Sequence, residues 1–269
     1  MDNQRIIYFS DYKITNKKYD KKEILSSFLL KLVNIIFILI GLIFILKGNP
    51  SFISFTYYEV PLSLIMGIIY VTSATLDLIR YFTKLDLRNK YLYTAKFILT
   101  INEVAFLFIH LAQCLPGLFI NDAPTRLIIG EFILAYLVPI ISFFDFISYD
   151  YNYQTKRSYA YFSLIPFGIY YLILLLISYN TNITWNNYFD LSVTLKMPYP
   201  ILDYTLNNYI ANGTTDFSKG LSGQPIVFSL FIIAVFLICL SILVLHLKNK
   251  KCIKTYNIPY TGVSVHQDI

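Results

Sequence analysis

Three ionisable side chains in one apolar stretch have a spacing that places them on a single face of a helix. Lys96, Glu103 and His110 follow one another at intervals of seven residues, which is about two turns of an α-helix. Because an ionised side chain in hydrocarbon costs roughly 2.5–3.5 kcal/mol on insertion scales, such residues normally face a bundle interior or a water-filled cavity. A carboxylate near an imidazole can move protons or bind a polar group, and the alternative interpretation is that these residues only fix helix packing.

The next apolar stretch along the chain supplies partners at matching depths. Glu131 lies about two turns after its beginning, and Asp145 lies near its end. If the two stretches run antiparallel through a membrane, His110 can meet Glu131 and Lys96 can meet Asp145. We therefore predict a polar intramembrane face built from Lys96, Glu103 and Asp145, with His110 and Glu131 within hydrogen-bond or one-water reach.

A further charged pair, Asp77 and Arg80, lies near the end of an earlier apolar stretch. Residues three apart are neighbours on a helix, and a long Arg side chain can also extend toward the membrane surface. The spacing favours a structural pair within one helix.

Signatures of soluble enzymes and of metal sites are absent from the sequence. There is no GxSxG, P-loop, HExxH or GxGxxG motif. Cys114 and Cys239 lie in apolar stretches, Cys252 lies among lysines, and no CxxC or Cys/His spacing typical of zinc sites is present. We therefore expect no metal and no cofactor.

The composition requires a membrane. Of the 269 residues 56% are hydrophobic and 14% are charged, and a soluble domain of this length would need more polar surface to cover its core. A span needs roughly 20 mostly apolar residues and must be a helix, because only a helix satisfies its backbone hydrogen bonds within one segment. The sequence therefore predicts an all-α, polytopic membrane protein with six transmembrane helices, at about 24–46, 59–82, 94–115, 125–148, 159–178 and 225–247.

The distribution of Lys and Arg predicts the orientation of these spans. Most of the 22 basic residues fall in the tail 1–23, the second and fourth connections and the tail 248–269. The opposite side holds only Lys47, Arg126, Lys196 and Lys219. This bias places the N and C termini in the cytoplasm, and we expect a plasma-membrane protein whose partner is the lipid bilayer. The scattered basic residues, without a basic helix that carries interleaved aromatics, argue against nucleic-acid binding. The sequence carries no signal of oligomeric state.

One connection, residues 179–224, is long, aromatic and rich in Asn. Long connections without secondary structure of their own are commonly lids or flexible segments. Because Tyr, Trp and Phe side chains are enriched at membrane interfaces, we expect this connection to lie on the outer membrane surface.

Four short motifs occur in an order that resembles a known family. They are the aromatic–Thr segment Ser54–Tyr58, the helix segment Ala135–Pro139 with Phe144–Phe146, the pair Pro166 and Tyr170, and the outer-loop motif Pro198, Tyr199, Pro200 and Asp203. Together they resemble the androgen-induced, FAR-17a-type six-helix membrane proteins and their bacterial relatives, over most of the chain after the first helix.

The resemblance implies a candidate active site. Characterised animal members are threonine-dependent hydrolases of lipid esters, with a Thr nucleophile and a His in the membrane, and Thr56 matches the position of the nucleophile. The family's His precedes the fourth-helix proline by about four residues, where this chain has Leu134 and Ala135. A Thr hydroxyl needs a base, so His110 or Glu131 must substitute. The alternative role for Thr56 is to cap its helix through a backbone N–H.

Three functions fit the sequence. The first is a lipid-ester hydrolase, or a non-catalytic relative of one, that takes a lipid or small-molecule substrate at Thr56, His110 and Glu131. The second is a carrier for a small solute or a proton along the polar face of Lys96, Glu103 and His110, although the internal repeats common in carriers are not evident. The third is a membrane scaffold without a site. A cavity open only to the outer leaflet favours the enzyme, and a continuous path favours transport.

The predicted orientation makes Cys252 reachable only from the cytoplasm, because it lies in the basic C-terminal tail. An impermeant thiol reagent is therefore expected to label Cys252 in permeabilised cells and not in intact cells. Labelling of Cys252 in intact cells would overturn the orientation.

Overall fold

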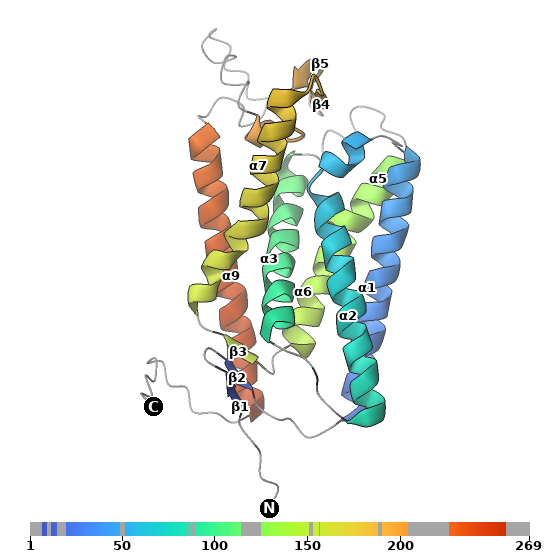
Figure 1. The fold of residues 1–269 in the computed structure, drawn as a ribbon, viewed down its shortest axis with the longest axis vertical. Coiled ribbons are helices and arrows are strands. Elements are labelled where there is room, and N and C mark those ends of the chain that lie inside the picture. Colours follow the sequence, from blue (N-terminus) through green and yellow to red (C-terminus); the bar gives the residue numbers. More distant parts are fainter. Residues whose placement is uncertain are drawn as a thin grey trace, which may run out of the picture.

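In the computed structural model the chain forms a bundle of long helices (Figure 1). The structure describes residues 7–9, 12–14, 20–48, 52–84, 87, 90–113, 125–150, 153–155, 157–187, 190–203 and 226–256. Within these ranges, six helical segments are long and apolar enough to cross a membrane: Lys21–Gly48, Glu59–Thr83, Tyr91–Leu111, Thr125–Tyr149, Arg157–Asn180 and Phe228–Lys251. The protein is therefore a multi-pass helical membrane protein, as the sequence predicts.

The helices keep the labels of Figure 1. They are α1 (Lys21–Gly48), η1 (Phe52–Thr56), α2 (Glu59–Thr83), α3 (Lys90–Gln113), α5 (Thr125–Phe132), η2 (Ile133–Leu137), α6 (Val138–Tyr149), η3 (Arg157–Ser163), α7 (Leu164–Asn180), η4 (Pro200–Leu202) and α9 (Ile226–Tyr256). Helices α1, α2, α3 and the α5–α6 segment pack together, and α7 and α9 lie along the α3 side of this group (Figure 1).

Short strands join the connections at the two ends of the bundle. Strands β1 (Ile7–Phe9), β2 (Tyr12–Ile14) and β3 (Tyr153–Thr155) form an antiparallel sheet at one end, which we call the termini end. Strands β4 (Trp185–Asn187) and β5 (Asp190–Leu195) form an antiparallel pair at the other end, the hairpin end (Figure 1). The sheet pairs the N-terminal segment with the fourth connection, so both lie at the same end of the bundle, as alternating spans require.

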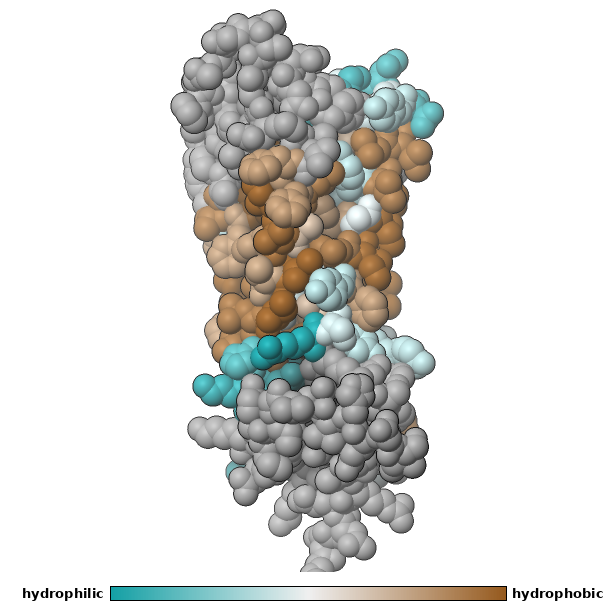
Figure 2. All heavy atoms as spheres, turned by 90° about the vertical axis from the view of Figure 1, so that its left-hand side faces the viewer, coloured by the Kyte–Doolittle hydropathy of each residue, from teal (hydrophilic) through white to brown (hydrophobic). Residues whose placement is uncertain are grey.

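The surface between the two ends is apolar. Figure 2 shows a band of hydrophobic side chains across the middle of the molecule, with hydrophilic residues toward its ends. Leu176 on α7 and Phe231 on α9 are both 64% exposed, whereas Glu103 at the middle of α3 is 2% exposed. This arrangement, apolar outside and polar inside, is the one that a hydrocarbon solvent selects.

The fourth span contains a widened turn. Residues of η2 form a π-helical turn in which the N–H of Val138 donates to the carbonyl of Ile133, five residues earlier. Pro139 follows directly; its ring has no N–H and would clash with the carbonyl four residues before it in a regular helix. The widened turn accommodates this proline, and both Tyr136 within the turn and Glu131 before it are buried.

The last helix differs from its predicted end at 247. Helix α9 continues to Tyr256, so the predicted tail 248–269 begins inside a helix. Lys248, expected to be solvated, is fully buried: its ammonium donates to the Tyr93 hydroxyl and lies 4.5 Å from the centre of that ring. The Lys stem packs along the apolar bundle while its charge contacts a polarisable ring. The side chain of Cys252 lies outside the described residues.

The described part of the long connection after α7 packs against the hairpin end of the bundle, and its position at the outer membrane surface stays a prediction. Trp185 and Leu195 of the β4–β5 pair are buried and pack on Ile53 and Ile177. Of the aromatic side chains described in this connection, Trp185 and Tyr199 are buried, whereas Tyr179 is 73% exposed. Residues 204–225 of this connection lie outside the described part of the chain.

Two glycines allow α1 and α5 to approach closely. A Cβ atom on Gly130 would lie 2.7 Å from Cγ1 and 2.9 Å from the backbone N of Ile45, and one on Gly41 would lie 2.5 Å from the Leu134 side chain. Backbone atoms cannot move aside as flexible side chains can. Small residues at this crossing therefore set the distance between the two helices.

Gly130→Ala is expected to lower the free energy of unfolding by about 1–3 kcal/mol, because the added methyl group overpacks the crossing. Gly168→Ala is the matched control, since nothing lies within 4 Å of a Cβ there. Thermal unfolding of the purified protein in detergent measures both. Equal melting temperatures for the two variants would contradict this account of the crossing.

Candidate functional site

Buried polar side chains follow one another along the inner faces of α1, α2, α3, α5 and α6, and we call them the polar column. The column has three parts. The hairpin-end cluster contains Glu59, His110, Glu131, Tyr136 and Tyr199; the central cluster contains Asn34, Tyr70, Thr100, Glu103 and Ser142; the ion-pair network contains Lys31, Asp77, Lys96, Asp145 and Asp150.

His110 is at the centre of the hairpin-end cluster. Its Nε2 lies 3.3 Å from Oε2 of Glu131, and its Nδ1 lies 2.9 Å from the hydroxyl oxygen of Tyr136. The predicted approach of His110 to Glu131 is confirmed. The widened turn of the fourth span positions both partners, since Glu131 precedes it and Tyr136 lies within it.

Glu59, the first residue of α2, is a member of this cluster that the sequence analysis missed. It is buried, and its carboxylate lies near enough to Glu131 and His110 for electrostatic interaction. Its position at the edge of an apolar stretch concealed it, because a Glu at the start of a span is ordinarily solvated. Two carboxylates and one imidazole therefore meet in one buried place, where a proton can be shared among them.

The outer-loop motif contributes a side chain to the same cluster. The Tyr199 hydroxyl donates to Oε2 of Glu59 over 2.6 Å and accepts the backbone N–H of Tyr58 over 2.9 Å. Asp203 holds the turn that presents Tyr199, because its Oδ2 accepts the N–H groups of Lys196 and Met197 at 2.5 and 3.3 Å. Of the two prolines of the motif, Pro198 is buried and Pro200 begins η4.

Thr56 lies at the end of η1 with its hydroxyl fully engaged. That hydroxyl donates to the carbonyl of Ile53 over 2.6 Å and accepts the indole N–H of Trp185 over 2.9 Å. No hydrogen bond joins Thr56 to His110, both of which the structure describes. The expectation that Thr56 caps α2 is wrong, because Tyr58 occupies the N-cap position and Thr56 bonds backward to η1. Its role as a nucleophile stays a prediction.

The central cluster is held together by a serine on α6. The Asn34 side-chain N–H donates to the Ser142 hydroxyl over 3.0 Å, and that hydroxyl also lies beside Glu103 and Tyr70. Helices α1, α2, α3 and α6 thus meet at one point. Thr100 lies one turn before Glu103 on the same face of α3 and is fully buried.

Several oxygens of the central cluster have no hydrogen-bond partner among the described residues. They are Oδ1 of Asn34, the hydroxyls of Tyr70 and Thr100, and both carboxylate oxygens of Glu103. Buried polar atoms in proteins are almost always paired, and exceptions indicate water, an ion or a functional group. Glu103 is the strongest exception, because a carboxylate loses most when it leaves water without partners.

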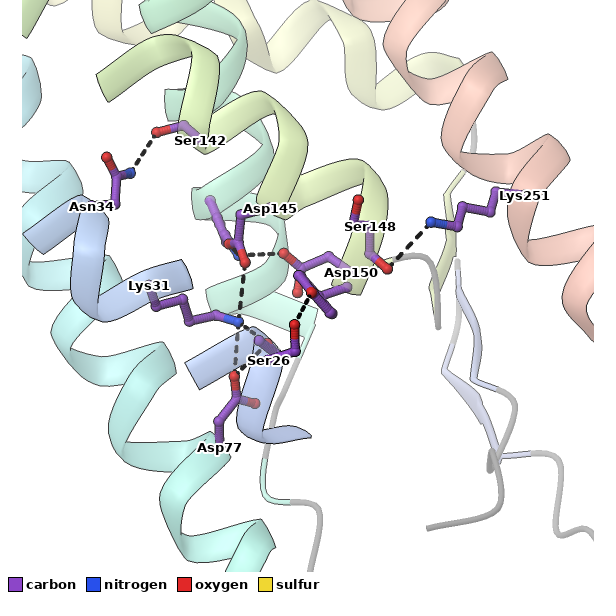
Figure 3. A network of polar contacts seen from close by, with 12 residues as sticks. Ser26, Lys31, Asn34, Asp77, Ser142, Asp145, Ser148, Asp150 and Lys251 are labelled. Carbon is purple, nitrogen blue, oxygen red and sulfur yellow. Dashed lines mark hydrogen bonds and ion pairs between the residues drawn. The ribbon is translucent and has the colours of Figure 1, made fainter. Parts of the chain in front are cut away.

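The ion-pair network joins four helices near the termini end (Figure 3). Lys96 on α3 contacts Asp145 and Asp150, which confirms the predicted pairing with Asp145. Lys31 on α1 lies 2.8 Å from Oδ2 of Asp77 and 3.3 Å from Oδ1 of Asp145. Asp145 therefore bridges the two lysines.

Asp77 was expected to pair with Arg80 within α2, but Asp77 pairs instead with side chains of α1. The Ser27 hydroxyl donates to Oδ2 of Asp77 over 2.7 Å, and the Lys31 ammonium donates to the same atom. Asp77 is buried on the face of α2 that packs against α1, so an interhelical partner is nearer than one on its own helix.

An apolar pocket lies beside the column in the hairpin half of the bundle. It is lined by Tyr58, Asn102, Phe106, Tyr170, Tyr199 and Ile233, among others. Its cavity volume is about 20 Å³, enough for roughly one water-sized group and far below the roughly 300 Å³ of small-molecule sites. Thr56 is not among the lining residues.

Neither a metal-ligand group nor a matching protein identifies the chemistry of the polar column. Among the described residues, no group of three or more His, Cys, Asp or Glu side chains is arranged to hold a metal ion. No protein-family model, curated protein or solved structure matches the chain. The resemblance to FAR-17a-type proteins therefore stays a prediction.

Thr56→Ala is expected to lower the free energy of unfolding by about 1–3 kcal/mol, because the buried indole N–H of Trp185 loses its acceptor. Thr56→Ser keeps the hydroxyl and is the matched control. Trp185 is the only tryptophan, so its fluorescence reports this contact directly while thermal unfolding measures stability. An unchanged melting temperature and emission in Thr56→Ala would contradict the assigned hydrogen bond.

Proposed function

We propose that the protein is a membrane carrier that moves protons through the polar column. The observation that carries this proposal is the Glu103 carboxylate, which is buried at the middle of a span with the neutral Ser142 hydroxyl beside it and no cation paired with it among the described residues. A buried ionisable group inside a membrane bundle is typical of proton relays and substrate pathways.

Helices α2 and α3 supply polar groups at three matching levels, which supports a path. Glu59 and His110 belong to the hairpin-end cluster, Tyr70 and Glu103 to the central cluster, and Asp77 and Lys96 to the ion-pair network. On α3 the levels are about 10 Å apart along the helix axis. Groups that bind and release protons thus succeed one another along the bundle.

The hydroxyl groups between these levels can relay protons. The Ser142 hydroxyl lies beside Glu103, and Ser63 is buried on α2 one turn after Glu59. A hydroxyl both donates and accepts, so it can pass a proton between groups too far apart for direct transfer. His110, whose two ring nitrogens contact Glu131 and Tyr136, supplies an exchange point at the hairpin end.

The scaffold alternative gains less support from the same contacts. Polar residues that only join helices are expected to pair with opposite charges, as Lys31, Lys96 and their aspartates do, although Oδ1 of Asp145 has no hydrogen bond among the described residues. Glu103 does not follow this pattern. The hydrolase alternative rests on the family resemblance alone, because the Thr56 hydroxyl donates to a backbone carbonyl and not to a base.

Proton transport is tested by reconstituting the full-length protein into liposomes that contain a pH-sensitive dye, with a potassium diffusion potential as the driving force. The wild-type protein is expected to acidify the lumen, and Glu103→Gln is expected to reduce the rate to that of protein-free liposomes. Glu23→Gln is the matched control, because Glu23 lies in the first turn of α1 outside the column.

Two results would contradict the carrier proposal. One is proton uptake at the wild-type rate by folded Glu103→Gln protein. The other is no uptake by wild-type protein whose melting temperature shows that it is intact. Thr56→Ala in the same liposomes is expected to carry protons at the wild-type rate, whereas ester hydrolysis abolished by this variant would support the hydrolase alternative.

A further inference from the structure

We infer that the central cluster binds a monovalent metal cation of the size of Na⁺ at the Glu103 carboxylate. This inference rests on the proposed carrier function and names an ion that competes with the transported proton for the same group. The juxtaposition that carries it is a set of buried oxygens from Asn34 of α1, Tyr70 of α2 and Glu103 of α3 beside Ser142 of α6, with Thr100 one turn before Glu103 and no cation paired with them among the described residues.

The chemistry of the unpartnered atoms points to a hard cation. They are a carboxylate, an amide carbonyl and two hydroxyls, without a nitrogen or a sulfur atom. Oxygen sets of this kind suit alkali and alkaline-earth cations, whereas imidazole and thiolate ligands suit transition metals. The amide of Asn34 is already oriented, because its N–H donates to Ser142 and leaves its carbonyl oxygen free.

The charge of the site selects a monovalent ion. Glu103 is the only carboxylate of the central cluster, and its cluster partners are neutral side chains. One Na⁺ makes the site neutral, whereas a divalent cation would leave a net positive charge inside the hydrocarbon. A proton on Glu103 gives the same neutrality, so the exchange is Glu103–COOH + Na⁺ ⇌ Glu103–COO⁻·Na⁺ + H⁺.

The charged groups around the cluster are already neutralised by other partners. Lys96 lies about two turns before Glu103 on α3 and pairs with Asp145 and Asp150. Lys31 on α1 pairs with Asp77 and Asp145. On the hairpin side, His110 faces Glu131 and Tyr136. Tyr58, the N-cap residue of α2, and Tyr70 within α2 lie near Glu103. Among the residues that the structure describes, no cation is therefore paired with the Glu103 carboxylate.

Equilibrium binding tests the inference without transport. Thermal unfolding of the purified full-length protein is measured in NaCl, KCl, CaCl₂ and choline chloride at equal ionic strength, at neutral and at alkaline pH. Na⁺ is expected to raise the melting temperature with a saturable dependence, as a ligand of the folded state does. The rise is expected to be larger at alkaline pH, because protons compete for Glu103. Direct binding of ²²Na⁺ provides a second measurement.

Single-residue variants test which side chains bind the ion. Glu103→Gln is expected to abolish the Na⁺-dependent rise, and Thr100→Val is expected to weaken Na⁺ binding while keeping the carboxylate and the side-chain shape. Glu131→Gln, in the hairpin-end cluster, is expected to keep the Na⁺-dependent rise. If Glu103→Gln fails to fold, the loss of ²²Na⁺ binding in Thr100→Val still decides the assignment.

Three outcomes would overturn the inference. The first is a melting temperature that is the same in NaCl, KCl and choline chloride at both pH values, which would mean that the cluster holds water only. The second is a Na⁺-dependent rise that persists in Glu103→Gln, and the third is stabilisation by Ca²⁺ alone. Proton uptake that still requires Glu103 would leave the carrier proposal standing in each case. Conversely, Na⁺ binding without any proton uptake would refute the carrier and keep the site.

Discussion

The pairing of two buried lysines with three aspartates is the interaction on which the arrangement of the bundle depends. Lys31 lies on α1 and Lys96 lies on α3. The aspartates that pair with them are Asp77 of α2, Asp145 of α6 and Asp150, which caps the end of α6. Each lysine therefore joins its helix to at least one other helix. Removing one partner from such a network typically costs about 3–5 kcal/mol, because an uncompensated charge stays buried. The network fixes the rotation of these helices about their axes, and that rotation brings Asn34, Glu103 and Ser142 to a common point one level higher.

The clusters of the column differ in how completely their polar atoms are satisfied. In the ion-pair network, opposite charges face each other, whereas in the central cluster a carboxylate faces neutral oxygens. The first arrangement is rigid, since each ammonium has several acceptors. The second has capacity left for a proton or an ion. A bundle that needed only mechanical strength would not keep an unpaired carboxylate beside a paired one on the same helix face.

The number of residues between each charged side chain and the end of its span predicted those contacts that depend only on the depth of a residue in the membrane. His110 meets Glu131, and Lys96 meets Asp145, because both pairs lie on consecutive antiparallel spans. The contacts of Glu59, Lys31 and Tyr199 depend on the rotation of helices about their axes and on how a loop folds back onto the bundle. The spacing of residues in a single sequence reveals neither of these. Lys31 did give a signal, since it is a charged residue within the first apolar stretch. The engagement of Thr56 by Trp185 was beyond sequence reasoning, because it needs the β4–β5 pair to fold inward.

The Tyr199 hydroxyl connects the loop after α7 to the charge on Glu59. A hydrogen bond to a carboxylate is roughly twice as strong as one to a neutral acid, so the loop is held more firmly while Glu59 is ionised. By thermodynamic reciprocity, a loop that is held in place also favours the ionised form of Glu59, and a loop that lifts away favours the neutral form. The charge on Glu59 and the position of Tyr199 are thus thermodynamically coupled, so that a change in either one shifts the equilibrium of the other.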